Sequence, residues 1–277
     1  MNIDEIIKNA LIEDIGDGDH TSLSCIEKNT YGKAKLLIKD KGILSGVAVA
    51  EKIFNQLDSN LMLTILLSDG AKINKGDIAF FVEGLSASIL TAERLVLNFM
   101  QRMSGIATAT AELVEIVKGT NAKILDTRKT TPLLREIEKM AVKTGGGYNH
   151  RMGLYDMIMI KDNHIDFAGG IEKAINATKA YLARNNKNLK IEIEARSIDD
   201  VKEIIKIGGI NRIMLDNFSP ENLKIAVQII NSKFETEASG GINKQNIRLY
   251  AETGVDFISV GAITHQIKSL DMSLKAI

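Results

Sequence analysis

Short apolar runs separated by turns occupy the first third of the chain. Residues 33–39, 61–67 and 78–83 are typical of strands, and segments rich in Gly, Asp and Asn separate them. Residues 87–103 carry apolar positions at helical spacing, and a second helical run continues to about residue 118. The pattern of apolar and polar positions changes near Ser104 and Gly105. We therefore predict a small α/β sandwich domain over residues 1–105, joined by these helices to a second domain.

After residue 120 the pattern becomes strand, loop and helix, repeated. Six segments predict strands, at residues 123–126, 157–160, 191–194, 212–216, 235–238 and 257–260. The last four recur roughly every 22 residues, the length of one βα unit, and Ser197, Ser219 and Asn243 stand where they would cap helices. We predict an α/β fold with an incomplete parallel β/α barrel of fewer than eight strands over residues 106–265. Residues 266–277 are expected to pack back on the first domain.

An open doubly wound sheet is the alternative fold. It is disfavoured because no G-x-G-x-x-G segment follows the first strand of the repeat.

Composition narrows the functional classes. The chain is 45% hydrophobic and 25% charged, and its formal net charge is zero, which argues against a nucleic-acid partner. The acidic start and the lack of a long apolar stretch predict a cytoplasmic protein without a membrane partner. Cys25 is the single cysteine, so no internal disulfide is possible, and no Cys/His spacing predicts a zinc site. We assign no role to Cys25, His20 or His265.

Positive charge nevertheless concentrates in one part of this neutral chain. Arg128, Lys129, His150, Arg151 and Lys161 lie within a short stretch that also contains three consecutive glycines. Guanidinium groups match carboxylates with two donors each, and lysines act as compact charges. The cluster predicts a pocket for a small polyanion.

Acidic side chains fall at the predicted strand ends of the same region. Glu194 and Asp216 stand where β/α barrels build active sites, although either could instead cap a helix. Facing an anion pocket, the two carboxylates would hold Mg²⁺, directly or through water, or stabilise a cationic transition state.

Glycines at two further strand ends predict a site for a terminal phosphate. Each segment leads from a strand toward a helix start, where free backbone N–H groups favour anions and glycine permits close approach. The residues are Ser239, Gly240, Gly241, Val260, Gly261 and Ala262.

Several of these segments together resemble one known family. They are residues 127–132 (TRKTTP), 146–151 (GGYNHR), 160–164 (IKDNH), 215–218 (LDNF) and 237–242 (EASGGI). The chain is similar here to the quinolinate phosphoribosyltransferase family, also called nicotinate-nucleotide pyrophosphorylase (carboxylating). Residues 13–21, 92–94, 97–99 and 104–107 resemble its N-terminal segment and linking helix, so the resemblance covers nearly the whole chain.

The resemblance implies an activity and an assembly. It implies a pentosyltransferase of NAD biosynthesis that joins quinolinate to phosphoribosyl pyrophosphate with Mg²⁺, giving nicotinate mononucleotide, pyrophosphate and CO₂. It also implies a homodimer, or a larger assembly of dimers, with shared active sites to which Arg94 contributes from the neighbouring subunit. No organic cofactor is expected, because the alkylated pyridine nitrogen itself accepts the electrons of the broken carboxylate bond.

The resemblance also distributes roles among the site residues. Arg128, Lys129, His150, Arg151 and Lys161 would line the quinolinate site, with Lys129 and Lys161 also catalytic. Glu194 and Asp216 would act in catalysis at the ribose and Mg²⁺, and the two glycine segments would hold the 5-phosphate.

Three alternative functions stay open. An enzyme that uses nicotinate would need only one carboxylate clamp, which the surplus of cations disfavours. A molybdenum-transport-associated homologue is disfavoured only by the completeness of the cationic set. A non-enzymatic phosphate-binding barrel would not need Glu194 and Asp216 to face the anion.

Overall fold

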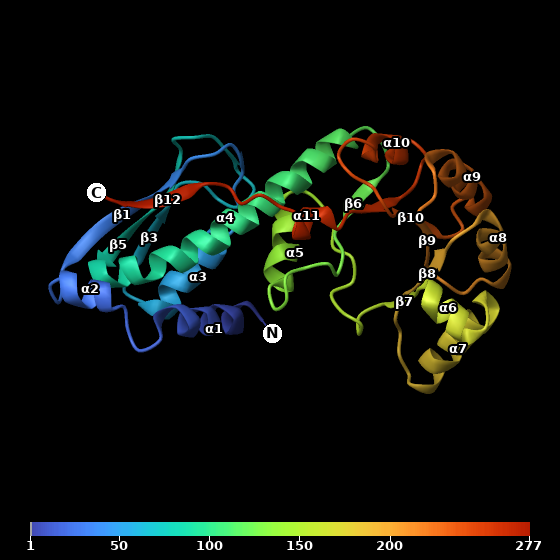
Figure 1. Cartoon of the computed structure of the whole chain (residues 1–277), viewed down its shortest axis with the longest axis horizontal. Helices are drawn as coiled ribbons and strands as arrows, with labels where there is room; N and C mark the ends of the chain where they lie inside the picture. The colour runs from blue at the N-terminus through green and yellow to red at the C-terminus, as the bar shows by residue number, and fades with distance from the viewer. Residues whose placement is uncertain (1) are drawn as a thin grey trace. The chain divides into compact units, whose positions relative to one another are not determined.

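The computed structural model describes residues 2–277 and divides the chain into two compact units (Figure 1). The first unit contains the chain up to Ala111, Thr130–Gly146 and Ile263–Ile277, and the second contains Glu112–Lys129 and Gly147–Ala262. The sequence predicts boundaries after residues 105 and 265 only, whereas the structure places Thr130–Gly146 with the first unit. Within the described residues, no helix is long and apolar enough to cross a membrane.

The first unit combines an antiparallel sheet with helices. Its elements are α1 (Ile3–Ile15), α2 (His20–Cys25), β1 (Tyr31–Ile38), β2 (Gly42–Ile43), α3 (Val47–Leu57), β3 (Met62–Ile65), β4 (Lys72–Ile73), β5 (Ile78–Leu85), α4 (Ser86–Ile116, which continues into the second unit), α5 (Arg135–Thr144), α11 (Ala262–His265, which begins at the last residue of the second unit) and β12 (Met272–Ala276). The main sheet has the order β12-β1-β5-β3, and β2 pairs separately with β4.

One face of the main sheet forms the core of the first unit. Along β1, buried Leu36 and Ile38 alternate with less buried residues, as a strand with one covered face requires. The rings of Phe54 in α3 and Phe80 in β5 meet edge to face at 6.0 Å, so α3 packs on this face. β12 pairs antiparallel with β1, which brings the red C-terminal strand beside the blue β1 in Figure 1.

Helix α4 is continuous where the sequence predicts an interruption. Gly105 lies inside it, and a Cβ atom at this position would come within 2.4 Å of the Lys268 carbonyl oxygen. The glycine therefore lets the C-terminal segment cross close to the helix. The adjacent Ser104 is buried, and its hydroxyl accepts a hydrogen bond from the Ser45 backbone N–H at 2.9 Å.

Buried polar contacts attach α5 to α4. The fully buried Glu138 accepts hydrogen bonds from Arg102 Nε at 2.9 Å and from the Thr131 backbone N–H at 3.2 Å. At the end of α5, a Cβ atom on Gly145 would lie 2.4 Å from the Ala107 carbonyl oxygen. This close packing explains why Thr130–Gly146 belongs to the first unit.

The second unit is a parallel β/α structure. Its elements are β6 (Lys123–Leu125), β7 (Ile158–Ile160), α6 (Asp162–Ala168), α7 (Ile171–Arg184), β8 (Ile191–Ala195), α8 (Ile198–Ile207), β9 (Arg212–Asp216), α9 (Pro220–Ile230), β10 (Glu235–Ser239), α10 (Ile247–Ala251) and β11 (Phe257–Ser259). Six parallel strands run in the order β6-β11-β10-β9-β8-β7, with β6 and β7 as the edges among the described residues. The predicted incomplete barrel is confirmed.

Two of the three predicted caps begin helices. Ser197 and Ser219 accept hydrogen bonds from the backbone N–H groups of Asp200 and Asn222 at the starts of α8 and α9. The prediction for Asn243 is wrong. Its side chain accepts the backbone N–H of Gln245 in a turn, and α10 begins only after Asn246.

Candidate active site

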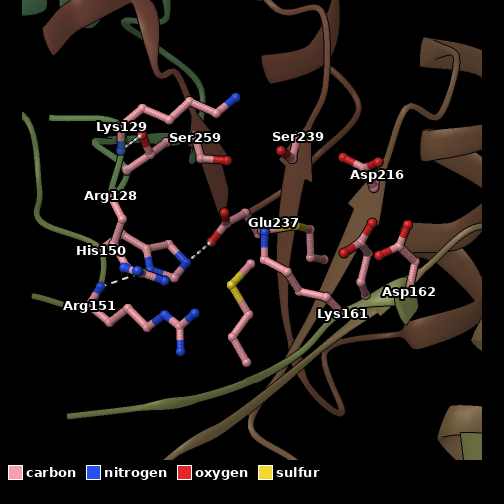
Figure 2. A pocket seen from close by; sticks show the side chains of 14 residues that line it. Arg128, Lys129, His150, Arg151, Lys161, Asp162, Asp216, Glu237, Ser239 and Ser259 are labelled. Carbon is pink, nitrogen blue, oxygen red and sulfur yellow. Dashed lines mark hydrogen bonds and ion pairs between the residues drawn. The ribbon is translucent and has the colours of Figure 1, made fainter. Parts of the chain in front are cut away.

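A pocket of about 320 Å³ opens at the C-terminal ends of the strands of the second unit (Figure 2). The predicted residues that line it are Arg128, Lys129, His150, Arg151, Lys161, Glu194, Asp216 and Ser239. The residues that the sequence prediction omitted are Thr127, Met159, Asp162, Met214, Glu237 and Ser259. The structure thus brings cations and carboxylates from most of the strands to one cavity.

The strand register explains this convergence. Glu194 on β8 lies opposite Met214 on β9, and Ser239 on β10 lies opposite Asp216. Side chains two residues apart point to the same face of a strand. On each strand, the residue two positions before a pocket residue therefore also points into the barrel.

The omitted residues follow the same period of two. Glu237 precedes Ser239 by two positions, Met214 precedes Asp216, and Met159 precedes Lys161. This spacing was a usable signal, because it assigns both members of each pair to the interior of the barrel. Thr127 and Asp162 are chain neighbours of predicted site residues.

The cationic side of the pocket comes from the segment after β6, the loop before β7 and the residue that follows β7. Arg151 is half-buried, and its guanidinium donates to the Met157 carbonyl oxygen at 3.0 Å. Burial and the nearby charge of Arg128 lower the pKa of Arg151. Two guanidinium groups that disfavour each other's charge form a site that an anion stabilises.

The acidic side of the pocket comes from β8, β9 and the start of α6. Burial and the negative charges of Asp216 and Asp162 raise the pKa of Glu194, although the Asp162 backbone N–H and Lys161 partly offset this effect. The Asn217 side-chain amide donates to Asp216 Oδ2, which orients that carboxylate. Mutually repelling carboxylate oxygens fit a hard cation such as Mg²⁺, so Glu194 and Asp216 suit the predicted metal.

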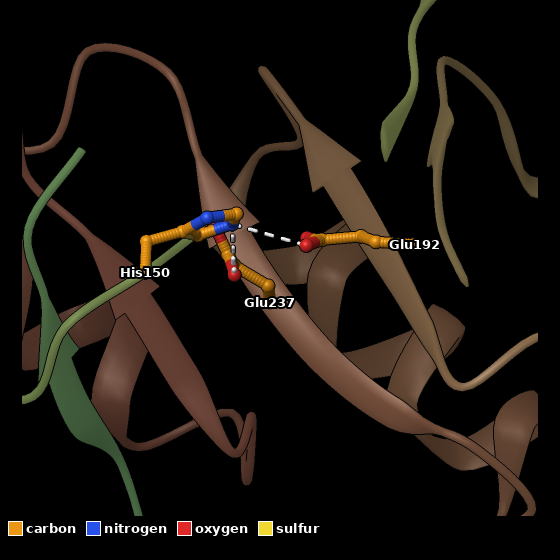
Figure 3. Close-up of side chains that lie close together, drawn as sticks. All are labelled: His150, Glu192 and Glu237. Atoms are coloured by element: carbon orange, nitrogen blue, oxygen red, sulfur yellow. Dashed lines mark ion pairs between the residues drawn. The ribbon is translucent and has the colours of Figure 1, made fainter. Parts of the chain in front are cut away.

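His150 lies beneath these two sides, in a buried ionic cluster (Figure 3). Its Nε2 atom is 3.0 Å from Glu192 Oε2 and 3.4 Å from Glu237 Oε2. Burial alone would lower the pKa of His150, but the hydrogen bonds and charges of the two carboxylates raise it. Nδ1 accepts the Arg151 backbone N–H at 2.8 Å, so Nε2 is the atom that carries a proton toward the carboxylates.

The same three side chains are spaced as metal ligands could be, but their hydrogen bonds argue against a metal. An ion on Nε2 would leave the ring proton on Nδ1, where it would oppose the Arg151 N–H. Arg212 also donates to Glu237 Oε2 at 2.9 Å and already supplies a positive charge. We therefore describe this cluster as a set of ion pairs that holds His150.

Only one of the residues predicted to hold the phosphate lines the pocket. Ser239 lines the pocket, whereas Gly240, Gly241, Val260, Gly261 and Ala262 do not. The Ser239–Gly241 segment does not lead directly into a helix, because the turn around Asn243 intervenes, while Ala262 starts the short α11. Gly240 has a φ of 94°, and a Cβ atom there would lie 2.9 Å from the Asn217 backbone nitrogen, so only glycine suits this crossing.

Arg94 lies on α4 in the first unit and does not line this pocket. Its side chain is exposed and lines a separate cavity of about 410 Å³ with His20 and Asp19. The Nε2 atom of His20 lies 3.4 Å from Oδ1 of Asp17, and Cys25 is exposed.

Comparisons with known proteins place nearly the whole chain in one family. Residues 19–104 match the family described as quinolinate phosphoribosyl transferase, N-terminal domain, and residues 106–275 match the corresponding C-terminal domain. The chain is 46% identical over 285 residues to quinolinate phosphoribosyltransferase (decarboxylating) 1 of Nicotiana glauca, covering 98% of this chain and 81% of that protein. It is 40% identical over 274 residues to the probable nicotinate-nucleotide pyrophosphorylase (carboxylating) of Bacillus subtilis, covering 99% and 93%.

A solved structure shares the whole fold. The nicotinate-nucleotide pyrophosphorylase from Francisella tularensis superposes with a TM-score of 0.90 at 41% identity, covering 99% of this chain and 96% of that chain. Both units of the chain therefore have counterparts in that protein.

Proposed function

Because the chain belongs to the quinolinate phosphoribosyl transferase family, we propose that it transfers phosphoribosyl from phosphoribosyl pyrophosphate to quinolinate. The products are nicotinate mononucleotide, pyrophosphate and CO₂, as de novo NAD biosynthesis requires. The observation that carries this proposal is the single pocket with cations on one side and three carboxylates on the other. A dicarboxylate and a phosphoribosyl donor with its metal need these two surfaces together.

The cationic residues bind quinolinate in this proposal. Arg128 and Arg151 grip carboxylates with paired guanidinium donors, and His150 and the lysines 129 and 161 add polar and charged contacts. The mutual repulsion of the two arginines makes their complex with a dianion more favourable than the empty pair.

In this proposal Glu194 and Asp216 would hold Mg²⁺, directly through carboxylate oxygens or through bound water.

 When bound there, the ion would neutralise charge on the departing pyrophosphate. Asp162 adds a third carboxylate beside them, and its backbone N–H orients Glu194. Lys161 supplies positive charge between the acidic side and the quinolinate site.

The chemical step needs no general base. The lone pair of the pyridine nitrogen forms a bond to ribose C1 while the C1–oxygen bond breaks and its electrons leave with pyrophosphate. The residues of the pocket accelerate this step by holding the nitrogen in line with C1 and by stabilising the developing charges.

Decarboxylation follows from the product of that step. The bond from C2 to its carboxylate breaks, CO₂ leaves, and the electron pair stays on C2 beside the positively charged nitrogen. A proton then adds to C2 and completes nicotinate mononucleotide. The positive nitrogen stabilises the electron pair, so the protein's task is to hold the ring and exclude competing reactions.

We also propose a homodimer with shared active sites. Arg94 is an exposed cation in the first unit, outside the pocket of its own second unit. A second copy of the chain would receive this guanidinium at its quinolinate site, which adds a further donor for the dicarboxylate.

The direct test is release of CO₂ from carboxyl-labelled quinolinate. The reaction should require both phosphoribosyl pyrophosphate and Mg²⁺, and nicotinate mononucleotide should form in equal amount. Formation of pyrophosphate with nicotinate instead of quinolinate would indicate the monocarboxylate enzyme. Inactivity with quinolinate and with nicotinate alike would contradict the proposed function.

A further inference from the structure

Lys161 lies at the N-cap position of α6, where its side chain cannot accept a hydrogen bond from a backbone N–H group. It precedes α6 directly, the position that Ser197 and Ser219 hold before α8 and α9. A serine oxygen accepts a free N–H group at a helix start, whereas an ammonium group has three donors and no acceptor. The site chemistry of Lys161 therefore conflicts with the local need for a cap.

His164 supplies an acceptor from within the helix. Its Nδ1 atom accepts the Lys161 backbone N–H at 2.9 Å, three residues earlier in the chain. This contact is one half of a capping box, in which the third helical residue, usually Glu or Gln, reaches back to the backbone N–H of the cap residue.

Two further bonds fix the same backbone. The Lys161 carbonyl oxygen accepts the Ile165 N–H at 3.0 Å, and the next N–H, that of Asp162, bonds to the Glu194 carboxylate. The backbone around Lys161 is thus held on both sides. Because side-chain rotamers depend on backbone angles, this arrangement sets the direction in which Lys161 enters the pocket.

We propose that His164 is a positioning residue, which holds Lys161 in the substrate pocket by accepting its backbone N–H. His164 does not line that pocket itself but a neighbouring cavity with Leu154 and Ile158, so it acts through Lys161. This inference rests on the proposed role of Lys161 in binding the anionic substrate.

The first test compares two substitutions of His164. His164→Ala removes the acceptor, whereas His164→Gln keeps one that suits the third position of a capping box. We expect quinolinate affinity, measured by calorimetry, and kcat/KM to fall about tenfold in the alanine variant, since a misplaced binding group costs affinity and rate. The glutamine variant should recover most of both. Equal losses in the two folded variants would overturn the proposal.

Ser197→Ala is the matched control. It removes the same kind of bond at the start of α8, and its melting temperature should fall by a similar amount. Ser197 does not line the pocket, so quinolinate affinity should stay unchanged. If His164→Ala lowered only the melting temperature, as this control does, His164 would be a structural cap and the proposal would be wrong.

A double-mutant cycle separates this inference from the proposed function. Lys161→Ala should weaken quinolinate binding, and adding His164→Ala should weaken it no further, because residues that act as one unit are not additive. Additive losses would overturn the positioning role while leaving the role of Lys161 intact. Wild-type binding by Lys161→Ala would instead overturn the proposed role of Lys161 and, with it, this inference.

Discussion

The surroundings of Glu194 disfavour the charged form of its carboxylate. Burial and the charges of Asp216 and Asp162 raise its pKa, so the charged form destabilises the folded protein. We predict that Glu194→Gln melts at a higher temperature than the wild type in EDTA, because the substitution removes this repulsion. The same variant should lose turnover by about 100-fold if the carboxylate has its proposed role at the ribose and the metal. Thermal melting and labelled CO₂ release measure the two effects.

The pH dependence of that comparison has a defined sign. A carboxyl group whose folded pKa is raised costs stability above that pKa, and the cost disappears once the group is protonated in both states. The difference in melting temperature between Glu194→Gln and the wild type should therefore shrink as the pH falls from neutral. A difference that grew on acidification would contradict the assigned repulsion.

Arg128 tests the carboxylate clamp. Arg128→Ala should raise the KM for quinolinate by about 100-fold, because a guanidinium–carboxylate pair carries two charge-assisted hydrogen bonds. Arg128→Lys keeps the charge but loses the fork, so it should recover only part of the affinity. Steady-state kinetics with each substrate varied in turn would check this. An equal rise in the KM for phosphoribosyl pyrophosphate would argue against a quinolinate-specific clamp.

The site could be predicted only as far as its residues show a pattern on their own. Arg128 and Lys161 stand out as charges in a neutral chain. Glu237 and Ser259 do not, because a glutamate or serine within a short strand has many roles, and only the pairing of strands shows which face it occupies. His164 needed the hydrogen bond to Lys161 to acquire a role.

Among the elements, α4 offers a clear test of a glycine inside a helix. Alanine is the better helix former by about 1 kcal/mol, yet a Cβ atom at Gly105 would meet the Lys268 carbonyl oxygen at 2.4 Å. We predict that Gly105→Ala lowers the free energy of unfolding by about 1–3 kcal/mol, measured by urea denaturation. Asn98→Ala, at an exposed position of the same helix, should instead leave stability unchanged or raise it slightly. A more stable Gly105→Ala would show that the crossing has room for a side chain.

The same glycine explains where element prediction failed. Ser104 and Gly105 look like an interruption because glycine disfavours helices, and the reason for its presence lies in a segment far along the chain. The six parallel strands were predictable, because each is a short strand-like segment in a repeat of strand, loop and helix, and the last four recur at a regular spacing. The attachment of α5 to α4 was not, since it depends on the contact between buried Glu138 and partly buried Arg102.

For the whole molecule, the proposal that a second copy contributes Arg94 makes the active site a property of the dimer. Arg94→Ala and Lys161→Ala should each be inactive as homodimers, because each removes one cation from both sites. In a hybrid dimer, one site joins the intact Lys161 of the first variant to the intact Arg94 of the second, and the other site lacks both.

Mixing the two inactive variants should therefore restore activity. With random exchange of equal amounts, half of the dimers are hybrids with one intact site in two, so about one quarter of the wild-type activity should return. Mass spectrometry under native conditions would verify that hybrids form, and each variant mixed with itself is the control. Hybrids that form without any return of activity would show that Arg94 and Lys161 act in the same subunit, or that Arg94 does not serve the site at all.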